Sequence, residues 1–255
     1  YITKDIIIEL VNLLDNKFYL ENDRYFQRKE KIFSDYNKET IREPFFAGIT
    51  YSNDSIELEK FIDEYLKENI KHIESKESKL RMLVTPHIDY KRGGKCYGAS
   101  YNTLHNQKPD VILLIGTSHK YTETIFQCTR KDFKSPFSIS PNSKTYTDIL
   151  ISKYGEKRSL QDEIVHKEEH SLELQMPFIH KFFATTPIIP VLVGGFHQMI
   201  SEGKFPNEYS EYQDFSSGLV EVFKQFQKDS INYLIVAGVD MAHIGRYFGD
   251  TETLT

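Results

Sequence analysis

The sequence predicts an α/β domain in which helices flank a central sheet that is mostly parallel or mixed. Four short runs rich in Val, Ile and Leu show no polar alternation, which is typical of strands covered on both faces. Segments with helical spacing lie between these runs, as in sheets sandwiched by helices. The chain has 255 residues, of which 39% are hydrophobic and 27% charged, so it can build one sizeable core.

The predicted strands and helices follow from these patterns. Strands are expected at 82–84, 111–115, 188–193 and 233–237. Polar residues at 53–55 offer a cap for a helix that runs to about residue 70, with Glu57 three residues after Asp54. Further helices are expected at 2–14, 146–154, 171–183 and 215–226, and Gly155 should end the helix at 146–154. Residues 1–44 are predicted to form a peripheral helical arm, and residues 45–255 the α/β domain.

Composition excludes several classes of protein. The formal charge of -5 comes without a block of Lys or Arg, so nucleic acid is not an expected partner. No run approaches the ~20 apolar residues of a membrane span, and Lys4, Asp5 and Glu9 interrupt any signal-peptide core. The cysteines, Cys96 and Cys128, form no CxxC pair, which fits a reduced compartment. We therefore expect a cytoplasmic protein with no membrane partner.

Histidines follow three of the predicted strands. His87 and His119 come two to four residues after an apolar run, and His243 follows the last strand slightly later. Taken singly, such a residue more often caps or hydrogen-bonds a loop. Ligands of open α/β sheets bind beyond the carboxyl ends of the strands, so three histidines in this pattern predict a metal site. An oxygen or sulfur ligand would then decide between iron, zinc and copper.

Two other motifs offer alternatives. The run from His166 to His170 has the H-x-x-E-H form of a zinc peptidase, in which both histidines would share a helix face and Glu169 would act as base. Pro177 lies too close behind for a long ligand helix. Residues 92–95, Arg-Gly-Gly-Lys, lack the spacing of a phosphate-binding loop and are interpreted as a turn that could meet an anion.

Several short motifs together resemble the Memo family, whose bacterial and archaeal members are called AmmeMemoRadiSam system protein B. They occur in the order of that family and extend the match from about residue 45 to 250: Phe46-Ala-Gly-Ile-Thr-Tyr51, Thr85-Pro-His-Ile-Asp-Tyr90, Gly116-Thr-Ser-His119, Glu169-His-Ser-Leu-Glu-Leu-Gln-Met-Pro-Phe178 and Val239-Asp-Met-Ala-His-Ile-Gly245. Motifs in register are far more specific than any one of them.

The resemblance implies a fold similar to class III extradiol dioxygenases, which use non-haem Fe(II). By motif, His87 and His119 match two metal ligands, and His243 matches an acid/base. His170 matches a further cleft histidine, and Asp240 is expected to orient His243.

Two departures from the family pattern affect the site. Asp89 replaces a common Gly, and it would bind substrate beside the metal or cap a turn. Family members supply a third metal ligand, usually Cys, beyond the equivalent of Thr255, and neither Cys96 nor Cys128 matches that position. We therefore expect a truncated or incompletely ordered chain, whose site could lack metal.

Three functions follow as hypotheses. The leading one is an oxidoreductase in which Fe(II), with copper or zinc as alternatives, activates O2 and a small-molecule substrate. In it His243 would shuttle a proton and His170 would hydrogen-bond bound oxygen or substrate. The second is a non-enzymatic adaptor for a peptide or protein, and the family name implies radical-SAM and AMMECR-type partner proteins. The third is a zinc hydrolase that uses His166, Glu169 and His170.

Overall fold

The computed structural model describes residues 3–68, 79–240 and 243–251. The chain divides after residue 40 into two compact units, which are described separately. The first unit consists of helices α1 (Lys4–Asn16) and α2 (Asp23–Lys38). A side-chain oxygen caps the start of each helix, from Thr3 in α1 and from Asn22 in α2. The first unit is thus built from two separately capped helices.

A five-stranded mixed sheet forms the centre of the second unit, in the order β2-β8-β3-β7-β4. Four strands are parallel and β4 is antiparallel to β7. The bounds are β2 (Met82–Pro86), β8 (Tyr233–Val239), β3 (Val111–Thr117), β7 (Ile188–Val193) and β4 (Phe126–Cys128). The predicted fold class is therefore confirmed, and each of the four predicted runs is a strand. A smaller sheet contains β1 (Ile41–Arg42), β5 (Asp132–Lys134) and β6 (Ile139–Ser140).

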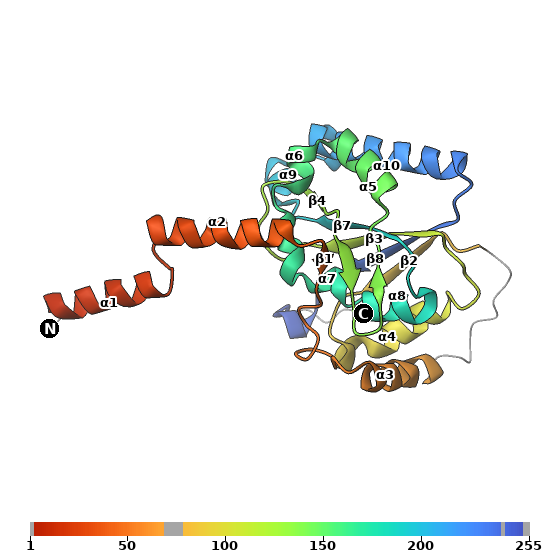
Figure 1. Ribbon diagram of the computed structural model, residues 1–255, viewed down its shortest axis with the longest axis horizontal. Coiled ribbons are helices and arrows are strands. Elements are labelled where there is room, and N and C mark those ends of the chain that lie inside the picture. The colour runs from red at the N-terminus through yellow and green to blue at the C-terminus, as the bar shows by residue number, and fades with distance from the viewer. Residues whose placement is uncertain (1–2, 69–78, 241–242, 252–255) are drawn as a thin grey trace. The chain divides into compact units, whose positions relative to one another are not determined.

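Helices cover both faces of the large sheet (Figure 1). On one side lie α3 (Ser55–Glu68), α4 (Tyr90–Asn102), α7 (His170–Glu173) and α8 (Met176–Phe183), and on the other lie α5 (Lys144–Tyr154), α6 (Glu156–Leu160) and α10 (Ser210–Lys228). The short helix α9 (His197–Glu202) follows β7, and the described residues also form 3₁₀ helices at Glu163–Glu168, Pro206–Glu208 and Arg246–Phe248. None of the helices described is both long and apolar enough to span a membrane.

Two buried clusters explain why the sequence of β3 lacks alternation, whereas in β2 Met82 and Val84 are exposed, so the expectation that this strand is covered on both faces was wrong. Val111 and Leu113 of β3 belong to the cluster that includes residues of α5 and α10, whereas Ile112 and Leu114 belong to the cluster that includes residues of α4 and α8. Successive side chains of a strand point to opposite faces, so a sheet with helices on both sides needs apolar residues at every position. This burial is the physical reason for the continuous apolar run.

Two predictions of local structure are wrong. The segment 171–183 is not one helix, because α7 ends at Glu173 and α8 begins at Met176. Pro177 has no N–H to donate to the carbonyl four residues earlier, which interrupts the helical ladder at this point. Residues 92–95 are not a turn but lie inside α4, where a Cβ on Gly94 would come within 2.3 Å of the Tyr65 ring of α3. The glycines therefore serve the close packing of two helices.

Candidate metal centre

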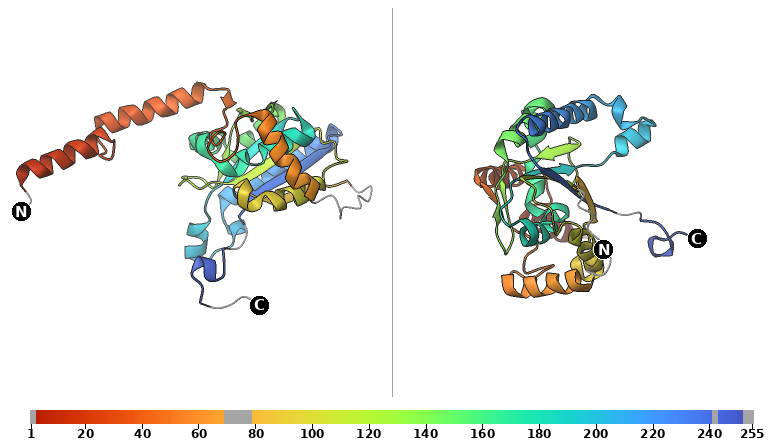
Figure 2. Two further views of the ribbon diagram at one scale, coloured as in Figure 1. Left: turned by 90° about the horizontal axis from the view of Figure 1, so that it is seen from below. Right: turned by 90° about the vertical axis from the view of Figure 1, so that its right-hand side faces the viewer.

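The candidate site lies at the carboxyl edge of the parallel strands. β2 ends at Pro86 and β8 at Val239, and these two residues are paired in the parallel register. The next residue of each strand, His87 and Asp240, is therefore delivered to the same place. The chain after β8 leaves the sheet in the segment coloured dark blue in Figure 2. Residues more than 150 positions apart thus meet through strand pairing, with His87 Nδ1 and the carbonyl of Gly238 3.1 Å apart.

Three histidines converge at this edge, but they are not the three that follow strands in the sequence: His170 from the Glu169–Phe178 motif takes the place expected for His243. His87, His119 and His170 each offer one ring nitrogen, and these atoms all lie within 4.8 Å of one another. The rings of His119 and His170 stack with centroids 4.3 Å apart, and the His87 ring stands edge-on to both. Imidazole nitrogens that meet in this way form a candidate three-histidine metal site.

The orientation of His87 fits the role of a metal ligand. Its Nδ1 donates a hydrogen bond to the Gly238 carbonyl, so in the neutral ring Nε2 carries the free lone pair. The side chain is 2% exposed, and Nε2 makes no hydrogen bond of regular geometry to the described residues, although Oδ1 of Asp240 lies 2.9 Å away. Buried polar atoms are rarely left unpaired, and a second hydrogen bond that orients the ring is typical of metal-binding histidines.

Glu169 holds the second imidazole. Its carboxylate accepts hydrogen bonds from the backbone N–H and the Nδ1 of His119, each at 2.9 Å, and from the backbone N–H of Ser171 at 3.0 Å. Burial alone would raise the pKa of Glu169, but these hydrogen bonds outweigh it and lower the pKa to about 2. The same hydrogen bond raises the pKa of His119. Glu169 is therefore an anchored carboxylate rather than a free base.

His170 completes the cluster from the start of α7. Its Nδ1 lies 3.3 Å from Oε1 of Glu169, and its ring meets the edge of Phe46, with centroids 5.8 Å apart. Burial lowers the pKa of His170, against the opposing effect of Glu169. The lower pKa favours the neutral imidazole, which is the form that binds metals.

A cavity of about 380 Å³ opens over the cluster, and it is also lined by the predicted site residues Asp89, Asp240 and His243 but not by Glu169. Asp240 lies with its Oδ1 2.9 Å from Nε2 of His87, while the exposed His243 ring packs against Phe248, with centroids 4.9 Å apart. Asp89 caps α4 by accepting from the backbone N–H of Arg92 and also pairs with its guanidinium. Of the two roles left open for Asp89, capping is the one observed.

The zinc-peptidase geometry expected for His166 is absent. His166 lies in the 3₁₀ helix Glu163–Glu168, and His170 begins a separate helix after the extended Glu169. The two histidines therefore share no helix face. His166 is 1% exposed, its Nε2 donates to the Gln127 carbonyl at 3.1 Å, and burial lowers its pKa to about 3. It is a structural residue.

Sequence reasoning missed a buried ion pair that supports the site. Arg42 pairs with Glu173 and donates hydrogen bonds to the carbonyls of His166 and Glu169, each at 2.9 Å. Glu173 also accepts from the backbone of Phe45 and Phe46 and from the Tyr51 hydroxyl. The pair thus joins the segment before α3 to the segment that carries Glu169 and His170. In the sequence, the only indication of this ion pair is that the charged Glu173 lies between Leu172 and Leu174.

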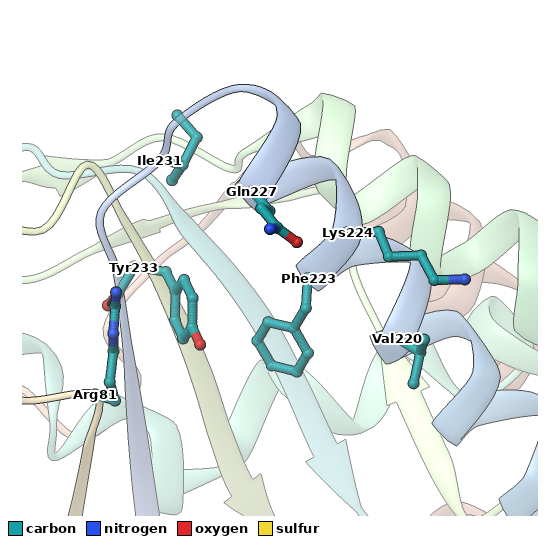
Figure 3. Close-up of a pocket in the computed structure, with 7 residues that line it drawn as sticks. All are labelled: Arg81, Val220, Phe223, Lys224, Gln227, Ile231 and Tyr233. Atoms are coloured by element: carbon teal, nitrogen blue, oxygen red, sulfur yellow. Dashed lines mark hydrogen bonds between the residues drawn. The ribbon is translucent and has the colours of Figure 1, made fainter.

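A second, larger cavity of about 450 Å³ lies at the opposite end of β8, beside α10 (Figure 3). Seven residues line it: Arg81, Val220, Phe223, Lys224, Gln227, Ile231 and Tyr233. None is a histidine, a cysteine or a carboxylate, and the Arg81 guanidinium lies 4.6 Å from the centre of the Tyr233 ring. This cavity therefore offers no metal-binding set.

Fold and site together define an α/β protein with a candidate three-histidine metal centre at the carboxyl edge of its sheet. The model of the Memo family, described as Memo-like protein, matches residues 42–254. The chain therefore belongs to the Memo family, which confirms the resemblance seen in its motifs.

Relatives named MEMO1 family protein support this membership. A relative from Aquifex aeolicus (strain VF5) is 29% identical over 255 residues, which cover 99% of this chain and 62% of the relative. Relatives from Methanobrevibacter smithii and Thermotoga neapolitana are each 26% identical, and the matches cover 80% of this chain and 70% of each relative. The chain thus spans less than two thirds of the Aquifex relative.

Proposed function

We propose that this chain carries the metal centre of a non-haem iron oxidoreductase. The observation that supports the proposal is the convergence of three imidazole nitrogens, two of which are oriented by hydrogen bonds at the far side of the ring. Bound Fe(II) would supply redox and oxygen chemistry, and copper and zinc are the alternatives for the same nitrogen donors. His87, His119 and His170 would hold the ion.

The surrounding residues have separate tasks in this proposal. Glu169 and the Gly238 carbonyl keep the rings of His119 and His87 in one tautomer. His243 lines the cavity and is exposed, so its imidazole can pass a proton between a substrate and the solvent. A cavity of about 380 Å³ suits a small molecule or one side chain of a peptide. The interaction with radical-SAM and AMMECR-type partner proteins stays a prediction.

Metal analysis tests the proposal most directly. The protein is produced anaerobically with Fe(II), and the iron content is compared among the wild type, His87→Ala and His119→Ala. His197→Ala is the control, because this histidine is exposed on α9, outside the cluster. We expect bound iron in the wild type and the control and its loss in the other two. Equal iron in all four proteins would end the proposal.

A second measurement separates an enzyme from an adaptor. Oxygen consumption is followed with pools of cell metabolites, in the wild type and in His243→Ala. We expect His243→Ala to keep its iron and to lose turnover, because His243 lines the cavity but is not one of the three clustered imidazoles. Tight peptide binding that survives His87→Ala, with no oxygen consumed by the wild type, would instead favour the adaptor.

A further inference from the structure

The carboxylate of Asp240 faces the metal-binding nitrogens of two histidines. Its Oδ1 lies 2.9 Å from Nε2 of His87, and its Oδ2 lies 3.9 Å from Nε2 of His119. Asp240 is the first residue after β8, and its side chain is 48% exposed. An ion that enters the cavity can therefore reach this carboxylate and both nitrogens together.

The hydrogen bonds of His87 and His119 determine which ring nitrogen of each faces Asp240. Nδ1 of His87 faces a carbonyl oxygen and Nδ1 of His119 faces a carboxylate oxygen, and both partners can only accept hydrogen bonds. In the neutral rings both Nε2 atoms therefore present lone pairs toward Asp240. A lone pair and a carboxylate oxygen repel each other at 2.9 Å unless a cation lies between them. That cation is either a proton or a metal ion.

The separations fit a shared metal ion, although a hydrogen bond through a proton would give the same 2.9 Å between His87 and Asp240. Two ligand atoms that each lie ~2.1 Å from one metal, at a right angle, are about 3.0 Å apart. The contact between His87 and Asp240 has this spacing. Nε2 of His87 is also buried, and among the described residues Asp240 is the charged group that faces it.

We propose that Asp240 is an anionic metal ligand that acts together with His87 and His119. The inference rests on the proposed iron centre and changes its ligand set, because the oxygen ligand then comes from the end of β8. A pair of imidazoles with one carboxylate is the donor set typical of non-haem Fe(II) oxygenases. The carboxylate also offsets part of the charge of a divalent ion. His170, whose ring stacks on that of His119, can supply a further nitrogen ligand beside these three residues.

The test uses Co(II) as a spectroscopic probe with the full chain. Co(II) affinity and the visible absorption of the bound ion are measured in the wild type, Asp240→Asn and Glu168→Gln. Asparagine keeps the size of Asp240 and one acceptor oxygen, but it replaces the other oxygen by an NH2 donor and removes the charge. Glu168 is the control because it directly precedes Glu169 and His170 in the sequence, while its carboxylate pairs with Lys120 instead of facing the cluster. Mutation of a group that only supports a ligand weakens binding roughly 10- to 100-fold, so we expect a loss beyond about 100-fold, with a changed spectrum, in Asp240→Asn.

The outcomes separate this inference from the proposal on which it rests. An unchanged affinity and spectrum in Asp240→Asn would show that Asp240 shares only a proton with His87, and the inference would be overturned. Unchanged Co(II) binding in His87→Ala would remove the metal centre itself. If Asp240→Asn fails to fold, wild-type protein labelled with ¹³C-aspartate is compared by infrared spectroscopy with and without Co(II). A shifted carboxylate band supports the inference, and an unshifted one contradicts it.

Discussion

The two cavities at opposite ends of the sheet differ in the side chains that line them. The larger, at about 450 Å³, is lined by Arg81, Tyr233 and residues of α10, whereas the smaller, at about 380 Å³, receives imidazoles and carboxylates from the ends of three strands. Parallel strands end at one edge, so the loops that follow them bring distant residues together there. Convergent polar groups, rather than volume, therefore distinguish the candidate site.

We expect the largest difference in stability between variants that break a buried and an exposed ion pair. Glu173→Ala leaves Arg42 buried without its partner, and side chains in this pair are at most 1% exposed. We expect the free energy of unfolding to fall by about 3–5 kcal/mol, as for other broken buried pairs. Glu221→Ala is the matched control, because Glu221 forms an exposed pair with Lys224 beside the larger cavity. Urea denaturation measures both variants.

In the control the free energy of unfolding should stay nearly unchanged, because solvent screens the exposed pair. A similar small effect in Glu173→Ala would mean that Arg42 finds other acceptors when Glu173 is lost. The Arg42–Glu173 pair would then not support the site.

Acid should lower the free energy of unfolding through the buried His166. Burial lowers the pKa of His166 to about 3, below its ordinary value of 6.5. Between these values the unfolded chain binds a proton at His166 and the folded chain does not, so the free energy of unfolding falls as the pH decreases. His166 alone should account for a loss of about 2 kcal/mol between pH 7 and pH 5.

Denaturation of the wild type and His166→Gln at pH 7, 6 and 5 measures this contribution. The variant should show the weaker dependence on pH. Parallel curves would show that His166 is protonated as easily in the folded protein as in the unfolded chain.

The smallest effect is expected at the larger cavity. Arg81→Ala removes a guanidinium that lies 4.6 Å from the centre of the Tyr233 ring. An exposed cation–π contact is worth roughly 0.5–1 kcal/mol, and the loss should be no greater. Thermal unfolding and iron content are measured together, and iron should be unchanged. Loss of iron in Arg81→Ala would show that the two ends of the sheet are coupled.

The fold was predictable where burial leaves a continuous pattern. The runs at 111–115 and 188–193 identify strands because both of their faces lie under helices. Helix α4 was missed because it contains glycines, which have no side chain and usually indicate a turn. The sequence does not show that the Tyr65 ring occupies the space over Gly94. β4 was missed because it has three residues, too few to show a pattern.

The site was predictable where one residue type follows a strand or belongs to a motif. His87, His119 and His170 could be named in this way, whereas the position of the Asp240 carboxylate depends on the register that pairs Pro86 with Val239. No local pattern specifies that register. The same holds for Arg42 and Glu173, which are 131 positions apart and form their contact through the tertiary structure.

The central position of β8 has a consequence for biosynthesis. Ile235 pairs with Met82 on one side and with Leu113 on the other, so a late segment of the chain fills the gap between two earlier strands. A nascent chain that has emerged only as far as β7 exposes the inner edges of β2 and β3, and unpaired edges are sites of aggregation. The same nascent chain lacks the Gly238 carbonyl that orients His87. Metal capture should therefore follow completion of the sheet.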